Sequence, residues 1–231
     1  MLQKFLEVLA WTDWLALVWF AGCWAGYSVI ADRGIIAARG LVGVGHNYRV
    51  LWAQRLIERD NRVADSALTG NLQSSVSFFA NATVFVIGGL MAVLGGLDQL
   101  MNATRDLPFA RQVPREVWEI KLLLLLWVFV TAYFKFTWSM RQFNLYCILI
   151  GAAPAPGSPP EQAEPYARKL AAVSSLAGEE FNLGIRAYYF GLAALAWFIN
   201  PWLFIAANTA VVVVLYLRDF RSRLVRVLSE P

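Results

Sequence analysis

Residues 56–89, LIERDNRVADSALTGNLQSSVSFFANATVFVIGG, are the stretch that decides the fold. Their charged side chains all lie in the first third, and the last of them is Asp65. The next ionisable side chain is Asp98, so residues 66–97 carry no charge over 32 positions. A helix of that length measures about 48 Å, which exceeds the roughly 30 Å hydrocarbon core of a bilayer. The stretch therefore predicts a surface helix that continues without a break into a membrane span.

The composition favours a membrane protein with several spans. Of the 231 residues, 58% are hydrophobic, and ten are Trp that lie largely at the ends of apolar runs, as in the aromatic belts of a bilayer interface. The net charge of +4 comes mostly from Arg residues that alternate with Asp and Glu. That alternation argues against the continuous basic face of a nucleic-acid-binding protein. We expect a single integral membrane domain with an all-α fold, a polytopic helix bundle in the lipid bilayer.

Four apolar runs predict four transmembrane helices, at approximately residues 13–31, 75–97, 117–137 and 187–217. Apolar residues that recur on one helical face predict amphipathic juxtamembrane helices at approximately residues 46–68 and 165–183. Between these lies a linker, residues 151–165, whose five Pro and two Gly predict no regular structure.

The last apolar run, residues 187–217, allows two interpretations. A proline at position 201, near its middle, must kink or break a helix. A hairpin broken there would leave about 14 to 17 residues in each half, fewer than the roughly 20 that a span needs. We therefore expect one long span kinked at Pro201. The loop charges favour the hairpin instead, because Lys and Arg divide 8 to 10 across the membrane for four spans but 4 to 14 for a hairpin.

Small and polar residues form one narrow stripe along the second span, and its polar members are Ser74, Ser77 and Asn81. Hydrocarbon cannot satisfy hydroxyl and amide groups, so the stripe should face protein or water. Two interpretations remain open. The stripe is either a helix-packing face or the polar lining of a pathway.

Charged residues near the membrane supply the other candidate contacts. Arg55, Arg59, Arg62 and Asp65 precede the second span and are candidates for contact with an anion, a lipid head group or a partner. Lys135 lies between two Phe residues in the third apolar run and is an intramembrane charge candidate. Snorkelling of its long side chain towards the interface is the simpler alternative.

Residues for catalysis or metal binding do not form a recognisable set. His46 is the only histidine, and both Cys23 and Cys147 lie in apolar runs, so a His/Cys metal site has too few ligands. The serines around Ser74 lack a partner base. We expect no metal and no cofactor, we name no catalytic residue, and the sequence leans against an enzyme.

Four stretches carry a family resemblance: RDNRVADSALTGNLQSSVSFF (59–79), HNYRVLW (46–52), RAYYFGLAALAWFINPWLF (186–204) and LYLRDFRS (215–222). In these stretches the chain resembles the bacterial branch of the "domain of unknown function 599" family (DUF599), which implies a multi-pass membrane protein with four spans. The resemblance assigns no residue a role, and it indicates the bacterial inner (plasma) membrane as the location.

Two functions remain after these exclusions. The first is an oligomeric channel or transporter for a small solute or ion, because four spans rarely enclose a pathway alone. The stripe of the second span would then face the pathway, and Arg59, Arg62 and Asp65 would lie at its cytoplasmic mouth with the N-terminus outside. The alternative is a structural or assembly protein that binds lipid head groups or a partner subunit through its Arg-rich juxtamembrane helix. Either function implies a homo-oligomer or a partner membrane subunit.

Overall fold

The computed structural model describes residues 9–32, 38, 40–104 and 113–229, and these residues form helices without any strand. The predicted all-α fold is therefore confirmed. Within the described residues, four helical segments are long and apolar enough to cross a membrane, as expected of an integral membrane protein: Trp11–Ala31, Val63–Gly95, Arg115–Gly151 and Pro201–Leu228.

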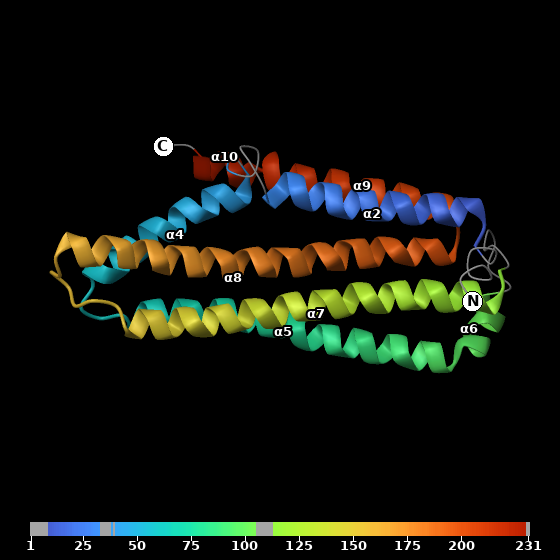
Figure 1. Ribbon diagram of the computed structural model, residues 1–231, viewed down its shortest axis with the longest axis horizontal. Coiled ribbons are helices and arrows are strands. Elements are labelled where there is room, and N and C mark those ends of the chain that lie inside the picture. Colours follow the sequence, from blue (N-terminus) through green and yellow to red (C-terminus); the bar gives the residue numbers. More distant parts are fainter. Residues whose placement is uncertain (1–8, 33–37, 39, 105–112, 230–231) are drawn as a thin grey trace.

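Five long helices lie side by side along one axis (Figure 1): α2 (Trp11–Asp32), α5 (Val63–Gly95), α7 (Arg115–Gly151), α8 (Pro160–Ala194) and α9 (Pro201–Phe220). The shorter elements among the described residues are α4 (Leu41–Glu58), α6 (Leu97–Thr104), the 3-10 helix η1 (Leu195–Phe198) and α10 (Arg223–Ser229). The antiparallel pair α7 and α8 is the centre of the bundle. Helix α5 packs on α7, α4 and α9 pack on α8, and α2 packs on α9.

The last apolar run is a hairpin, so our expectation of one long span kinked at Pro201 is wrong. The chain leaves α8 at Ala194, passes through η1, and returns as α9 beside α8 (Figure 1). Asn200 has an extended backbone, as residues before proline prefer, and its side chain accepts a hydrogen bond from the N–H of Trp202. An Asn cap followed by Pro at the first helical position is a helix-start signal. This helix-start signal divides the last apolar run at Asn200, although each half of the run is shorter than an ordinary span.

The surface helix and the second span are separate helices, so the predicted unbroken helix and the amphipathic helix at 46–68 are also wrong. Helix α4 ends at Glu58 and α5 begins at Val63. Asn61 stabilises the turn just before α5, because its side-chain oxygen accepts a hydrogen bond from the Val63 N–H at 2.9 Å. Asp and Asn favour such turns and caps over a helix interior. The turn lets α4 lean back onto α8.

Helix α8 begins inside the predicted linker and joins two elements that we expected to be separate. It starts at Pro160, so only residues 152–159 connect it to α7. Pro160 stands at the first helical position, where its missing N–H costs no hydrogen bond. From there one helix of 35 residues contains the predicted amphipathic segment and the beginning of the last apolar run.

Aromatic rings fill the middle of the bundle. Phe136 of α7 is fully buried, and its ring packs against Phe79 of α5 and against Phe181 and Tyr188 of α8, with ring centroids 5.6 to 5.7 Å apart. Gly184 of α8 leaves room for this ring, because a Cβ at that position would lie 2.5 Å from Cε1 of Phe136. The glycine therefore sets how closely α7 and α8 approach.

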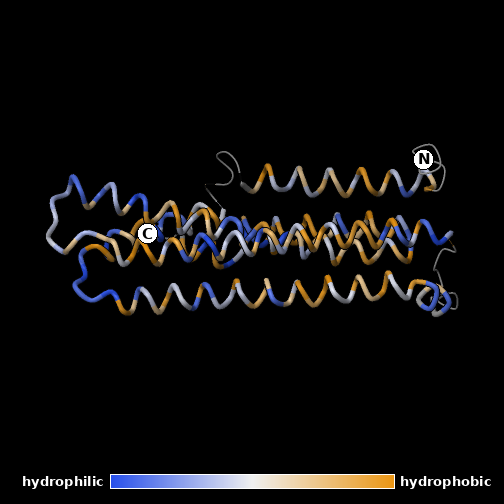
Figure 2. Tube along the Cα trace, turned by 60° about the horizontal axis from the view of Figure 1, so that its bottom comes forward, coloured by the Kyte–Doolittle hydropathy of each residue, from blue (hydrophilic) through white to orange (hydrophobic). Residues whose placement is uncertain are grey.

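Hydropathy divides the bundle along its length (Figure 2). Polar residues gather most extensively at the end where residues 152–159 connect α7 to α8, and apolar residues dominate the long helices away from it. Asp65 and Arg62 lie at this polar end.

Candidate functional site

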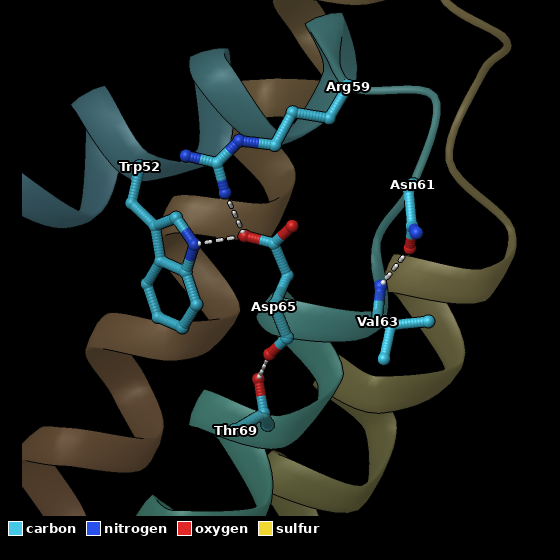
Figure 3. A network of polar contacts seen from close by, with 6 residues as sticks. All are labelled: Trp52, Arg59, Asn61, Val63, Asp65 and Thr69. Carbon is cyan, nitrogen blue, oxygen red and sulfur yellow. Dashed lines mark hydrogen bonds and ion pairs between the residues drawn. The ribbon is translucent and has the colours of Figure 1, made fainter.

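Asp65 is a buried carboxylate that joins α4 to α5 (Figure 3). Its side chain is 0% exposed, and its Oδ1 accepts two hydrogen bonds of 2.7 Å, one from Nε1 of Trp52 and one from Nη1 of Arg59. Thr69 Oγ1 donates to the backbone oxygen of Asp65 at 2.8 Å. The carboxylate lies in the first turn of α5, where the helix dipole favours negative charge. Its second oxygen, Oδ2, has no hydrogen-bond partner among the described residues.

Arg62 caps the end of α7. Its guanidinium donates to the backbone oxygens of Ile150 at 3.4 Å and Ala153 at 2.9 Å, and also to that of Pro154. These are carbonyls at and beyond a helix C-terminus, which lack partners within the helix. The side chain therefore holds the connection between α7 and α8 against the turn between α4 and α5.

The predicted charge cluster thus has two roles. Arg62 and Asp65 are engaged inside the protein, whereas the side chain of Arg59 is 44% exposed and Arg55 is also exposed. All four were candidates for contact with an anion, a lipid head group or a partner, and that stays a prediction. Of the four, Arg55 and Arg59 are exposed, Arg62 is half-buried and Asp65 is buried.

A half-buried charge, Arg49, which we did not predict, docks α4 onto α8. Burial lowers the pKa of Arg49, and the nearby Glu179 carboxylate opposes that shift. Gly178 makes room for the guanidinium, since a Cβ there would lie 2.4 Å from Nη2 of Arg49. On the same pair of helices, Nδ1 of His46 and Oγ of Ser175 are 2.8 Å apart. The sequence contained a sign of this contact, because Arg49 is on the same helical face as the buried residues Ala53 and Leu56.

The two lysines of α7 occupy different environments. Lys135, our intramembrane charge candidate, is 37% exposed, and its Nζ lies 2.9 Å from Oε2 of Glu180. Lys121 is the more buried, at 3% exposed, and its Nζ donates to the backbone oxygen of Trp197 at 2.7 Å. The Trp197 ring N–H in turn donates to the buried Asp13 at 2.8 Å. These polar contacts fix η1 against α2 and α7.

The structure divides the predicted polar stripe of the second span. Ser77 is half-buried and points towards α7, where its Oγ lies 3.8 Å from the sulfur of Met140. Ser74 and Asn81 are exposed on the outer side of α5. The side of α5 that packs inward carries other residues, namely Asp65, Thr69, Val76, Ala80 and Thr83.

Metal-binding side chains are scattered. Across residues 9–32, 40–104 and 113–229, no three His, Cys, Asp or Glu side chains lie close enough together to hold a metal ion. Cys23 and Cys147 are both free thiols.

Comparison with known proteins places the chain in a family. The family described as "Protein of unknown function, DUF599" matches residues 15–224, which is most of the chain. The chain belongs to the DUF599 family. Searches of the curated proteins and of the solved structures found no match. For this DUF599 protein, the functional argument therefore rests on its own residues.

Proposed function

We propose that the protein is a membrane assembly protein that associates with a second copy of itself through the outer side of α5. The observation that supports this is a row of exposed residues spaced alternately by four and three positions, which we call the α5 outer row. Its members are Ala67, Asn71, Ser74, Phe78, Asn81, Phe85, Gly88 and Ala92. Such a spacing follows one side of a helix in the way that coiled-coil seams do.

The composition of the α5 outer row suits helix packing. Small residues let two backbones approach closely, and Phe78 and Phe85, at 67% and 81% exposed, are large side chains that need a surface to cover them. Asn81 lies about 9 Å beyond the start of the predicted span at residue 75. An amide facing hydrocarbon at that depth has no water to bind, which disfavours a lipid-facing orientation.

A second copy of the chain is the simplest partner for this row. Two copies inserted with the same orientation are related by a two-fold axis along the membrane normal, so their α5 helices run parallel. Asn81 of each copy then lies near Asn81 of the other, and the two amides can donate to and accept from each other. A single Asn in such a seam also specifies register and the number of helices.

The arrangement of the interior argues against our first expectation, a channel with the charged residues at its mouth. Aromatic rings occupy the centre of the bundle, including the fully buried Phe136. Arg62 and Asp65 are engaged in joining helices. The polar residues left for a pathway, Ser74 and Asn81, alternate along the α5 outer row with Phe78 and Phe85. The packing interpretation accounts for both kinds of residue.

The test compares Asn81→Leu with Val84→Leu, since both positions are exposed on α5 but only Asn81 belongs to the α5 outer row. An interhelical Asn contributes about 0.6 to 2 kcal/mol, so we expect Asn81→Leu to weaken dimerisation about 3- to 30-fold. Val84→Leu should leave it unchanged. Energy transfer between labelled copies in liposomes, measured as the protein is diluted in lipid, gives the dimer dissociation constant of each variant.

Two results would contradict the proposal. One is a wild-type protein that stays monomeric at every protein-to-lipid ratio. The other is a combination of two findings. The two variants dimerise equally, and the wild-type protein gives an ion flux above that of empty liposomes, which Asn81→Leu abolishes. The second result would restore the channel interpretation.

A further inference from the structure

A cavity of about 320 Å³ opens between α8 and α9, away from the α5 outer row. Its polar lining comes from Asn182, Arg186 and Tyr189 of α8, from Arg218 and Asp219 of α9, and from Ser222 just beyond α9. The volume is within the range of about 300 to 1,000 Å³ that small-molecule sites occupy. Neither the sequence patterns nor the proposed assembly function assigns this cavity a role.

Arg186 forms the inner wall of the cavity. It is only 3% exposed, and its guanidinium lies over the ring of Tyr27 of α2, with 5.4 Å between the guanidinium carbon and the ring centroid. Asp219 Oδ2 is 3.8 Å from Nη2 of Arg186, too far for a hydrogen bond, and accepts a hydrogen bond of 2.5 Å from the Tyr27 hydroxyl. The surrounding helices therefore hold the buried guanidinium in a fixed position.

Arg218 forms the outer wall. Its side chain is exposed, and it donates to the Tyr189 hydroxyl while its guanidinium lies 5.8 Å from the centroid of the Tyr189 ring. The cavity lining thus contains two guanidinium groups and one carboxylate, which leaves a net positive charge. Three further arginines, Arg221, Arg223 and Arg226, follow within eight residues of Arg218 and add to the positive potential at this end of α9.

We propose that this cavity binds a phosphate group. Guanidinium groups match the geometry of phosphate oxygens and bind them through paired N–H donors, and Asn182 and Ser222 supply neutral donors beside them. The cavity also lies where the apolar run of α9 gives way to charge, between Leu217 and Arg218. Lipid phosphates occupy that depth in a bilayer. The phosphate is either that of an anionic lipid or free phosphate from solution.

The experiment measures binding of two probes to the purified, delipidated protein. Native mass spectrometry counts the bound molecules of phosphatidylglycerol, with phosphatidylcholine as the lipid control. The unfolding temperature in inorganic phosphate, compared with chloride at the same ionic strength, measures binding of free phosphate. We expect Arg218→Gln to weaken binding at least about tenfold, which corresponds to the loss of a hydrogen bond to a charged group. Arg223→Gln is the matched control, because it removes an exposed arginine that does not line the cavity.

The outcomes are distinct. If only phosphatidylglycerol binds, and its binding falls in Arg218→Gln, the cavity is a lipid site. If inorganic phosphate raises the unfolding temperature, and Arg218→Gln loses this rise, the cavity is a site for free phosphate. Binding of neither probe, or equal losses in Arg218→Gln and Arg223→Gln, overturns the proposal. Should Arg218→Gln fail to fold, Tyr189→Phe takes its place. It removes the hydroxyl that positions Arg218, and unchanged binding in that variant would also overturn the proposal.

Discussion

At the scale of single residues, Asp65 helps to hold the polar end of the bundle together. One oxygen of this fully buried carboxylate, in the first turn of α5, accepts hydrogen bonds from the indole of Trp52 within α4 and the guanidinium of Arg59 just after α4. Burying a charge is costly unless it is paired and hydrogen-bonded. The contacts of Asp65 therefore determine the angle at which α4 leaves α5.

Replacing Asp65 with Asn should destabilise the protein. The neutral amide keeps the shape of the side chain but loses the charge that strengthens both hydrogen bonds, a loss of about 1 to 2 kcal/mol. For a chain of this size we expect a fall of about 3 to 8 °C in unfolding temperature, measured by fluorescence in detergent. Asp60→Asn is the control because Asp60 is exposed. An equal fall in both variants would show that the buried contacts are unimportant.

Several of these residue-scale features could not be predicted from the sequence. The full burial of Asp65 and the partial burial of Arg49 depend on how α4 leans onto α8, and the turn after Glu58 sets that geometry. The pattern of alternating charges predicted solvent-facing contacts, because nothing local distinguishes Arg62, which caps α7, from Arg55, which stays exposed. The difference between these two arginines comes from their contacts with other helices, which the local sequence does not show.

At the scale of elements, the contact between α7 and α8 depends on a few small residues. Gly184 is the clearest case, because a methyl group there would lie 2.5 to 2.8 Å from three atoms of the buried Phe136 ring. The ring cannot move away without displacing Phe79 and Tyr188, which pack on it.

We expect Gly184→Ala to lower stability by about 1 to 3 kcal/mol, the range for overpacking a well-packed core. Gly22→Ala provides the matched control, since a Cβ at Gly22 would meet nothing within 4 Å. Unfolding of both variants in mixed micelles measures the difference. If Gly184→Ala were as stable as Gly22→Ala, the close approach of α7 and α8 would not depend on this glycine.

The success of sequence-based prediction also differs between elements for physical reasons. Helices α2, α5 and α7 were predictable because each contains a strongly apolar stretch, which in α7 runs between Lys121 and Lys135. The end of α8 was not, because its neighbours shield it and it can carry Glu179, Glu180 and Arg186 beside its apolar residues. The Asn200-Pro201 signal for the start of α9 was present, but the length criterion for an isolated span outweighed it.

At the scale of the whole molecule, the hairpin favours one membrane orientation if α8 and α9 each cross the bilayer. With α8 and α9 counted as separate crossings, Lys and Arg divide 4 to 14 instead of 8 to 10. From the positive-inside rule we therefore expect the polar end of the bundle and the C-terminus on the cytoplasmic side, and the N-terminus on the other side.

Site-directed labelling tests that orientation. Single Cys residues at Asn61, Asn102 and Arg226, in a background with Cys23→Ala and Cys147→Ala, are treated with an impermeant thiol reagent from either side. We expect Asn61 and Arg226 positions to react from the cytoplasmic side and the Asn102 position from the opposite side. Reaction of the Arg226 position from the same side as Asn102 would instead mean that α8 and α9 do not cross as a pair.

The shielding of α8 also has a consequence for how the protein is made. An insertion machinery recognises spans by their apolar character, and the end of α8 together with η1 offers only 12 uncharged residues, from Ala187 to Phe198. During synthesis this segment emerges before α9, whose contacts at Phe204 and Asp219 hold it in the finished bundle. We therefore expect α8 to enter the bilayer late, together with α9, after α2, α5 and α7 have provided the surface that receives it.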